Sequence, residues 1–435
     1  MKSIRCNKIV VKKLVFLTLV CLAAPIAAQI PRVIVTTDGE IDDKSSFVRY
    51  LMYSNEFDTE GLIYSNSVWQ KHGHGTTWMQ ETIDAWAEIR PNLAEHMTGY
   101  PTPESLKAVC FAGNMDEANL NDPGPLETEG ARHIISVLLK YDPRPVWILA
   151  WGGTNTIAQA LSLLEQDHTD EEVSYAHNKM RIYAVADQDE TAKWIRENYP
   201  HIFYIQCHQF MALNYQHAGH PYSEHHIFSD EWMTENVKSG HGPLGAMYPQ
   251  SYFSEGDSPS FFHLIGNGLR SAQNPTWGGW GGRFMIYGRS HYYSDANDDG
   301  DRLHGQWIWL LDIQEDFAAR MDWCVKSYKE ANHYPMIKGK IPEEVIASPG
   351  EEIQLKVKKI KDPDGDELTV SWEHYHFAGE NPYAHKIDIQ ETSESQASIK
   401  IPEDAGGKEL HIILTVVDNG TPMLKRYKRV VVKVE

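Results

Sequence analysis

Short apolar runs alternate with helical patterns along roughly the first three quarters of the chain. Apolar side chains recur at helical spacing at Phe47, Tyr50 and Leu51, and again over 157–161. The strand-like runs between such patterns are rich in branched side chains and cover 33–35, 60–64, 145–150, 180–186 and 201–206. Strands that alternate with helices predict an α/β domain whose mostly parallel sheet carries helices on both faces.

The pattern changes near residues 335–342. Beyond them, short runs with alternating apolar and polar residues, such as 353–357, 368–372 and 429–434, are separated by turn-rich segments. Such runs, over about a hundred residues, predict a smaller all-β sandwich of the immunoglobulin-like kind. We therefore expect an α/β domain over residues 29–335 and a β-sandwich domain over 340–435.

The first 28 residues have the pattern of a signal peptide. Five basic residues precede an apolar run over 14–24, and small residues suited to cleavage follow it. The run is too short to span a bilayer, so we expect no integral membrane span and a secreted or periplasmic protein. A lipid anchor at Cys21 and a buried N-terminal element are the alternatives.

Charge and cysteine content narrow the function classes. The net charge of −20 becomes −25 when the five basic residues of 1–28 are removed. This strongly acidic balance argues against a nucleic acid polymer as partner. The remaining cysteines, Cys110, Cys207 and Cys324, lack metal-ligand spacing, and a single disulfide among them cannot be assigned.

Acidic side chains crowd the turn after the first predicted strand. Asp38, Glu40, Asp42 and Asp43 lie within six residues directly after the apolar run 33–35. Carboxylates this close repel one another, and a hard cation that draws them together explains their proximity. The alternative is a solvated acidic loop that caps the following helix.

Polar groups also follow the other predicted strands. These are Asn66, the segment Trp151-Gly152-Gly153, the pair Gln188 and Asp189, and Glu255 with Asp257 in an acidic loop ahead of an apolar run. In a parallel sheet such strand ends lie on one edge, so these groups can converge on one pocket. Taken singly, each also fits an ordinary turn.

Two further motifs have open interpretations. Trp277 and Trp280 stand among glycines, so either their faces are exposed as a platform for sugar rings or they tuck back to cover the sheet edge. The segment Asp362-Pro-Asp364-Gly-Asp366 resembles the acidic turn of bacterial immunoglobulin-like modules, some of which bind Ca²⁺. An aspartate-rich β-turn with no ligand is the interpretation that we favour for it.

The acidic turn Asp38-Gly-Glu-Ile-Asp42-Asp43 resembles the calcium-binding turn of nucleoside hydrolases, whose usual form is Asp-Thr-Asp-Pro-Gly-x-Asp-Asp. Thr36 stands in place of the first Asp, and Gly39-Glu40 in place of Pro-Gly. The segment from Trp151 is similar to the second conserved block of that family.

The wider chain, over about residues 31–333, resembles an exported bacterial branch of nucleoside hydrolase-like proteins, some of which are labelled cellulose-binding and commonly end in a β-sandwich. The motifs are Trp147 to Thr156, Asp187-Gln-Asp, Trp194-Ile-Arg, Glu255-Gly-Asp-Ser-Pro-Ser-Phe, Trp277-Gly-Gly-Trp-Gly-Gly-Arg and Asp316-Phe-Ala-Ala-Arg-Met-Asp-Trp.

The resemblance implies a calcium site and a mechanism. Ca²⁺ would be bound by Asp38, Asp43, Asp257 and the backbone carbonyl of Trp151, all oxygen ligands of the kind that this ion prefers. Asp38 would deprotonate the attacking water, and Asp42 and Asn66 would hold the furanose hydroxyls. The expected substrate-binding residues are Glu40, Asn66, Gln188, Asp189, Glu255, Trp277 and Trp280. His72, His74, His241 and Glu255 are equivalent candidates for protonating the leaving group.

Together these expectations describe a secreted Ca²⁺-dependent hydrolase of N- or O-glycosidic bonds of a furanose-like sugar, acting on a carbohydrate or glycoside. The alternative is a non-catalytic protein that binds a cellulose-like polysaccharide in the same pocket. A weaker third option is a scaffold in which calcium only stabilises the fold. The resembling family often forms homo-oligomers, and the sequence has no interface pattern that tests this.

Overall fold

The computed structural model describes residues 30–214, 225–288, 291–339, 341–393 and 395–435. From Pro31 to Glu435 the chain forms one compact unit. The expected signal peptide lies outside the described residues, so it stays a prediction. Within the described part, no helix is both long and apolar enough to cross a membrane.

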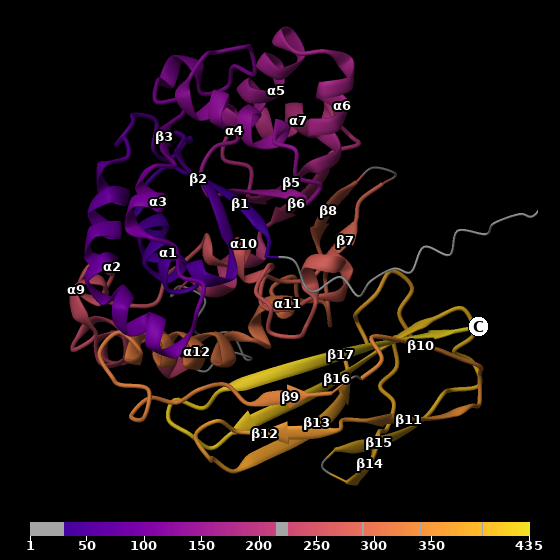
Figure 1. Cartoon of the computed structure of the whole chain (residues 1–435). Coiled ribbons are helices and arrows are strands. Elements are labelled where there is room, and N and C mark those ends of the chain that lie inside the picture. Colours follow the sequence, from indigo (N-terminus) through magenta and orange to yellow (C-terminus); the bar gives the residue numbers. More distant parts are fainter. Residues whose placement is uncertain (1–29, 215–224, 289–290, 340, 394) are drawn as a thin grey trace, which may run out of the picture. The chain divides into compact units, whose positions relative to one another are not determined.

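The larger part of this unit is built on an eight-stranded sheet (Figure 1) with the order β3-β2-β1-β4-β5-β6-β8-β7. The strands are β1 Arg32–Thr37, β2 Asp58–Tyr64, β3 Cys110–Ala112, β4 Val146–Ala150, β5 Met180–Val185, β6 Phe203–Cys207, β7 Phe284–Ile286 and β8 Tyr292–Asp295. Only β7 is antiparallel to its neighbour. The expected mostly parallel α/β sheet is therefore confirmed.

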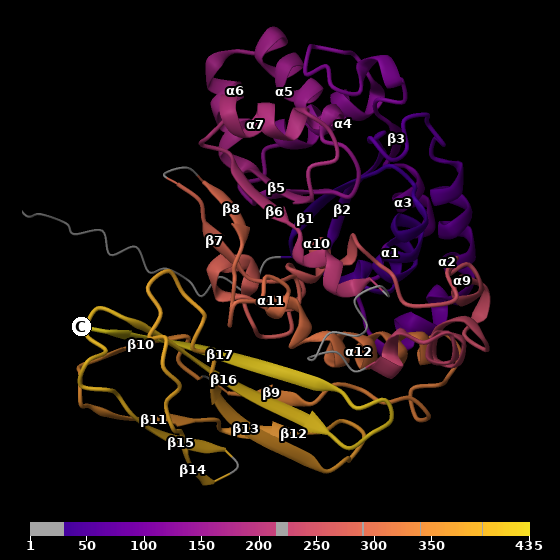
Figure 2. The same cartoon turned by 180° about the vertical axis from the view of Figure 1, so that it is seen from behind.

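Helices cover both faces of this sheet (Figures 1 and 2). They are α1 Ile41–Met52, α2 Thr77–His96, α3 Pro103–Lys107, α4 Glu129–Leu139, α5 Asn155–Asp167, α6 Asp170–Lys179, α7 Thr191–Asn198, α8 Asp230–Met233, α9 Gly242–Ala246, α10 Ser258–Phe262, α11 His304–Trp307 and α12 Leu310–Asp322. Single turns and one π-helical turn are η1 Ser54–Glu56, η2 Glu117–Asn119, η3 Gln209–Leu213, η5 His225–Phe228, η6 Thr234–Lys238, η7 Ser271–Gln273 and η8 Pro275–Trp277.

Alternate residues of the central strands face two separate cores. Val33 and Val35 of β1 pack in the core that includes side chains of α1, α2, α10 and α12. Ile34, between them, packs in the other core with side chains of α4, α5 and α7. Because successive side chains of a strand point to opposite faces, a strand that is buried on both faces is apolar throughout.

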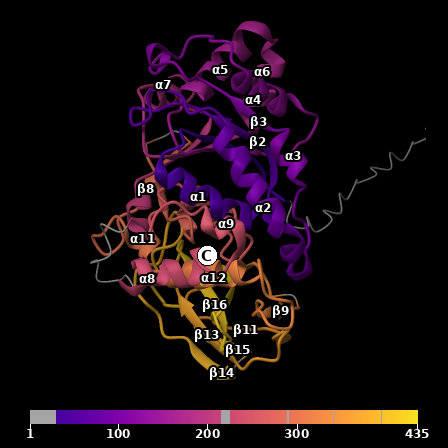
Figure 3. The same cartoon turned by 90° about the vertical axis from the view of Figure 1, so that its left-hand side faces the viewer.

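The C-terminal strands form antiparallel sheets with their own core (Figure 3). They are β9 Met336–Lys338, β10 Glu344–Ala347, β11 Glu352–Lys356, β12 Lys359–Lys361, β13 Leu368–His374, β14 Gln390–Ser393, β15 Gln396–Lys400, β16 Glu409–Asp418 and β17 Lys425–Val434. The sheet orders are β10-β17-β16-β13, β11-β15-β14 and β12-β9. Only β10 runs parallel to its partner. The second half of the fold prediction, a smaller all-β sandwich, is thus also confirmed.

The sandwich and the α/β part share buried contacts. Arg429 of β17 donates hydrogen bonds to the carbonyls of Trp277 at 2.7 Å and Gly278 at 2.8 Å. The side chains of Ile413 and Tyr427 belong to the same core cluster as those of α12. The exact domain limits expected from the sequence stay a prediction.

Candidate functional site

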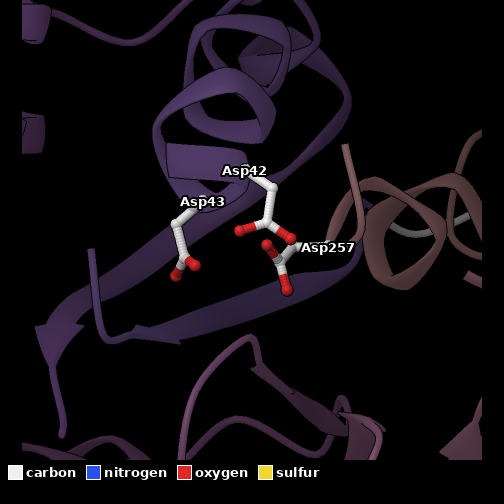
Figure 4. Close-up of side chains that lie close together, drawn as sticks. All are labelled: Asp42, Asp43 and Asp257. Atoms are coloured by element: carbon white, nitrogen blue, oxygen red, sulfur yellow. The ribbon is translucent and has the colours of Figure 1, made fainter. Parts of the chain in front are cut away.

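Three aspartates meet at the carboxyl edge of the parallel sheet. Asp42 and Asp43 lie in the first turn of α1, and Asp257 directly precedes α10. Each offers a carboxylate oxygen, and these atoms all lie within 4.8 Å of one another (Figure 4). Side chains more than 200 positions apart in the sequence thus converge on one point, because β1 and the segment before α10 both end at this edge.

Asp38 adds a fourth carboxylate, directly after β1. It is 1% exposed, and its Oδ1 accepts the Glu40 N–H at 3.1 Å. Its Oδ2 is buried without a hydrogen-bond partner, as is Oδ2 of Asp257. Asp43 has two hydrogen-bond donors. Its Oδ1 accepts a hydrogen bond from the Thr37 hydroxyl and one from the Asp38 N–H at 3.2 Å. Buried carboxylate oxygens without partners are costly, and these two are free to coordinate a cation.

Burial and mutual repulsion shift the acidity of the whole cluster. Burial is the largest cause in each case: it raises the pKa of Asp38, and it raises the pKa values of Asp43 and Asp257 well above the usual range. The pKa of Asp42 rises to about 6 through burial and the charge of Asp38. That of Glu40 rises to about 7 through burial and the neighbouring acids. A bound divalent cation would remove this penalty by favouring the ionised forms.

The turn between β4 and α5 explains the two glycines at this edge. A Cβ at Gly152 would lie 2.8 Å from Cβ of Asp38, and one at Gly153 would lie 2.4 Å from the Asn66 carbonyl oxygen. Neither position has room for a side chain, so the backbone after β4 approaches the acidic turn closely, as the Gly-Gly pattern predicts.

Trp151 reaches the site through its backbone. Its indole Nε1 donates to Oγ of Ser260 at 2.7 Å, and the side chain is fully buried. Its carbonyl, the expected metal ligand, accepts a hydrogen bond from Nε2 of Gln188 at 2.6 Å. Gln188 therefore lies at the site and contacts one of its expected ligands.

Asp189, an expected substrate-binding residue, has hydrogen-bond partners within the protein on both carboxylate oxygens. Its Oδ1 accepts hydrogen bonds from the Thr154 hydroxyl and from the N–H and hydroxyl of Thr191. Its Oδ2 accepts two from the N–H and side-chain amide of Asn155. With five donors on its carboxylate, Asp189 ties the starts of α5 and α7 together, and a sugar hydroxyl would have to displace one of them.

Glu255, which we expected to bind substrate or donate a proton, also has partners within the protein. It is fully buried and forms an ion pair with Arg49. The hydroxyls of Tyr248 and Ser258 donate to its two oxygens at 2.9 and 2.8 Å. A carboxylate with this many partners is a structural anchor, because its lone pairs are already used.

Asn66 is buried beside the site and held by its neighbours. Its Nδ2 donates to the Lys71 carbonyl at 3.0 Å, and its Oδ1 accepts from Nδ2 of Asn114 at 3.0 Å. Asn114, which follows the three-residue strand β3, was not among the residues expected here. The apolar run over 108–112 is the feature of the sequence that could have marked this strand end.

The candidate histidines differ in the residues that they contact. His72 is exposed and lies 3.6 Å from Glu117, and His241 lies 3.4 Å from Asp322. His74 accepts or donates a hydrogen bond with Gln70 at 3.0 Å, and its charge lowers the pKa of Asp38. Of the three, His74 is the one with an electrostatic contact to the acidic cluster.

The tryptophans are not an exposed platform. Trp277 is 9% and Trp280 is 1% exposed. Trp277 packs against the guanidinium of Arg270, 4.9 Å from the ring centre, and against His411, while Trp280 meets Tyr427 edge to face. The alternative interpretation, that both indoles tuck back against the protein, is the correct one, because β17 covers this surface.

Comparisons with known proteins agree with this architecture. Residues 32–284 match the family model "Cellulose-binding Sde182, nucleoside hydrolase-like domain", and residues 352–434 match "Cellulose-binding protein Sde0182, C-terminal domain". A comparison with curated proteins finds no match.

Among solved structures, a nucleoside hydrolase-related protein from Saccharophagus degradans, described as associated with carbohydrate metabolism, is similar over 94% of this chain and all of its own. Its identity is 33% and its TM-score 0.80. A plant nucleoside hydrolase aligns over 65% of this chain and 98% of its own at 12% identity, with a TM-score of 0.32 that is too low to carry an argument. The chain therefore belongs to the family of cellulose-binding, nucleoside hydrolase-like Sde182 proteins.

Proposed function

We propose that this protein is an exported Ca²⁺-dependent hydrolase that cleaves an N- or O-glycosidic bond of a furanose-like sugar. The observation that carries the proposal is the group of four aspartates with two unpartnered buried oxygens at the sheet edge. In α/β proteins this edge is where ligands bind. Export by way of residues 1–28 and the division into domains at residues 335–340 belong to the same proposal.

The donors at the site suit calcium. Asp38, Asp43, Asp257 and the Trp151 carbonyl would hold the ion, and all of them present oxygen, which hard cations prefer. The orphaned Oδ2 atoms of Asp38 and Asp257 are donors still free for such an ion. When bound, calcium would supply polarisation of a water molecule and an anchor for sugar hydroxyls.

Side chains of the protein would transfer the proton and hold the sugar. Asp38, which is buried directly after β1, accepts the proton of the attacking water. Asp42 accepts hydrogen bonds from the sugar hydroxyls and keeps the ring in register. Asn66 can join it only if its amide exchanges the Asn114 or Lys71 partner for the sugar.

A second candidate function is carbohydrate binding without turnover. Two observations favour it: the matching family models are described as cellulose-binding, and Thr36 stands where nucleoside hydrolases have an aspartate. The Thr36 hydroxyl is buried without a partner, so the pocket floor carries a neutral group in place of a charge.

The decisive experiment measures product release from furanosides, nucleosides and plant polysaccharides, with calcium and with chelator. Asp43→Ala should abolish release by removing a metal ligand, and Asp38→Asn should lower kcat strongly while retaining substrate. Asp388→Asn, an exposed acid of the sandwich, is the control and should behave as wild type.

Full activity of Asp38→Asn and Asp43→Ala on a substrate that the wild type hydrolyses would refute the metal-water mechanism. No release from any substrate, together with retention of polysaccharide on the wild-type protein, would replace the hydrolase with the binding function.

A further inference from the structure

A second acidic cluster lies in the β-sandwich. Asp362, Asp364 and Asp366 occupy the turn between β12 and β13, and each offers a carboxylate oxygen within 4.8 Å of the others. Acidic turns are common without a ligand, and Asp362 Oδ1 does close this one by accepting the N–H groups of Asp364, Gly365 and Asp366 at 2.8 to 3.1 Å. The turn alone therefore does not establish a site.

The second oxygen of Asp362 is the independent observation. Asp362 is 6% exposed, and its Oδ2 is buried with no hydrogen-bond partner. The hydrogen bonds that close the turn all use Oδ1. They therefore do not explain why Oδ2 is buried in a turn that carries two further carboxylates. A buried carboxylate oxygen without a donor is destabilising unless a cation meets it.

Asp418, at the end of β16, shows the same asymmetry. Its Oδ1 accepts hydrogen bonds from Asn332 Nδ2 at 3.1 Å and from the N–H groups of Gly420 and Leu424. Its Oδ2 has no partner, and the residue is 2% exposed. Burial and the nearby charge of Asp362 raise its pKa, so the two carboxylates lie within electrostatic reach of each other.

We propose that Asp362, Asp364 and Asp366 bind a calcium ion in the β-sandwich, at a site separate from the sheet-edge cluster, with Asp418 adding negative charge beside it. Ligands that are all oxygen, on a turn that can adjust, suit Ca²⁺ better than the strict octahedron of Mg²⁺.

The proposed site is tied to the segment that leads from α12 into the sandwich. Asp364 accepts hydrogen bonds from the His333 N–H at 2.8 Å and from its Nδ1 at 3.0 Å. The other ring nitrogen of His333 lies 2.9 Å from Nδ1 of His96 in α2. An ion that fixes Asp364 would therefore also hold His333, so calcium should stabilise the whole chain.

The test is calcium stoichiometry, measured by equilibrium dialysis of chelator-treated protein against CaCl₂, with the unfolding temperature as a second readout. We expect two bound ions per wild-type chain. Asp366→Asn and Asp362→Asn should each remove the sandwich ion. Each variant should also lose most of the rise in Tm that binding of this ion causes in the wild type. The side chain of Asp366 forms none of the hydrogen bonds that close the turn, so Asp366→Asn should fold. This variant therefore still tests the site if Asp362→Asn fails to fold.

Asp43→Ala should remove the sheet-edge ion only, and Asp388→Asn neither. If wild type binds one ion that Asp366→Asn loses and Asp43→Ala keeps, the sandwich site is supported and the calcium site of the proposed function is refuted. If Asp366→Asn binds as many ions as wild type with the same rise in Tm, the sandwich site is refuted. Equal binding of MgCl₂ at the same site would overturn its assignment to calcium.

Discussion

At the scale of single residues, two acids of one loop have opposite surroundings. Glu255 is neutralised by Arg49 and bonded by two hydroxyls, whereas Asp257, two positions later, has an unpartnered oxygen and faces Asp42 and Asp43. The sequence gives both as carboxylates in one acidic motif. The two acids differ because Arg49, which lies in α1, forms an ion pair with Glu255 and not with Asp257.

Glu255→Gln should therefore destabilise the protein rather than alter only its activity. The substitution leaves the fully buried guanidinium of Arg49 without a counter-charge, and removing one partner of such a pair costs about 3 kcal/mol. Urea denaturation measures the loss. The control Glu197→Gln breaks an exposed pair with Lys193 and should change stability by less than about 0.5 kcal/mol. Equal stability of the two variants would contradict the anchoring role of Glu255.

His263 should make the fold sensitive to acid. Both of its ring nitrogens are buried without partners, and burial lowers its pKa to about 3. Between that value and the unfolded value near 6.5, the unfolded chain binds the proton and the folded one does not, so stability falls as the pH drops. From pH 7 to pH 5 this one group costs about 2 kcal/mol.

His263→Leu should flatten that part of the pH profile, measured by urea denaturation at each pH. The exposed His385→Leu should leave the slope unchanged. A slope for His263→Leu that is as steep as that of the wild type would show that other groups govern the acid response.

At the scale of elements, the turn between β4 and α5 fixes the position of the acidic turn. Gly152→Ala would place a methyl group 2.8 Å from Cβ and 3.0 Å from the backbone N of Asp38. Backbone cannot yield as a flexible side chain can, so we expect a loss of about 1–3 kcal/mol in stability. Calcium affinity should fall at least tenfold, as titration calorimetry would measure. Gly406→Ala, whose added methyl would lie 3.7 Å from its nearest neighbour, should match wild type in both respects.

The strands that could be predicted from the sequence are those whose residues form a long apolar run. The runs at β1, β2, β4, β5 and β6 are apolar because both faces of each strand are buried, so all five strands could be predicted. Strands β3, β7 and β8 have only three or four residues each and lie at or near the sheet edges, so runs of that length in the sequence are hard to distinguish from loops. The acidic turn could also be predicted, because its four carboxylates lie within six residues of one another. Their mutual repulsion follows from the sequence without knowledge of the fold.

What a residue contacts across the fold could not be predicted in this way. The tryptophans of the Gly-rich segment are buried because β17 lies over them, and Asp189 is saturated because two helices begin beside it. Asn114 joins the site through tertiary pairing with Asn66. Apart from Thr191, which is two positions from Asp189, each of these partners is more than 30 positions away, and the local pattern is the same with or without it.

At the scale of the whole molecule, the shared core predicts that the chain unfolds as one unit. Tyr427 packs against Trp280 and Trp309, and Arg429 donates to two carbonyls of the α/β part. A chain that ends at residue 338 would expose both indoles as an apolar patch, so it should aggregate or melt at least 10 °C below the full protein. Calorimetry of the full protein should show one transition, because neither part can lose the other without uncovering buried surface. Two separate transitions, one of them matching the truncated chain, would instead mean that the α/β part is stable by itself and that the contacts around Arg429 add little.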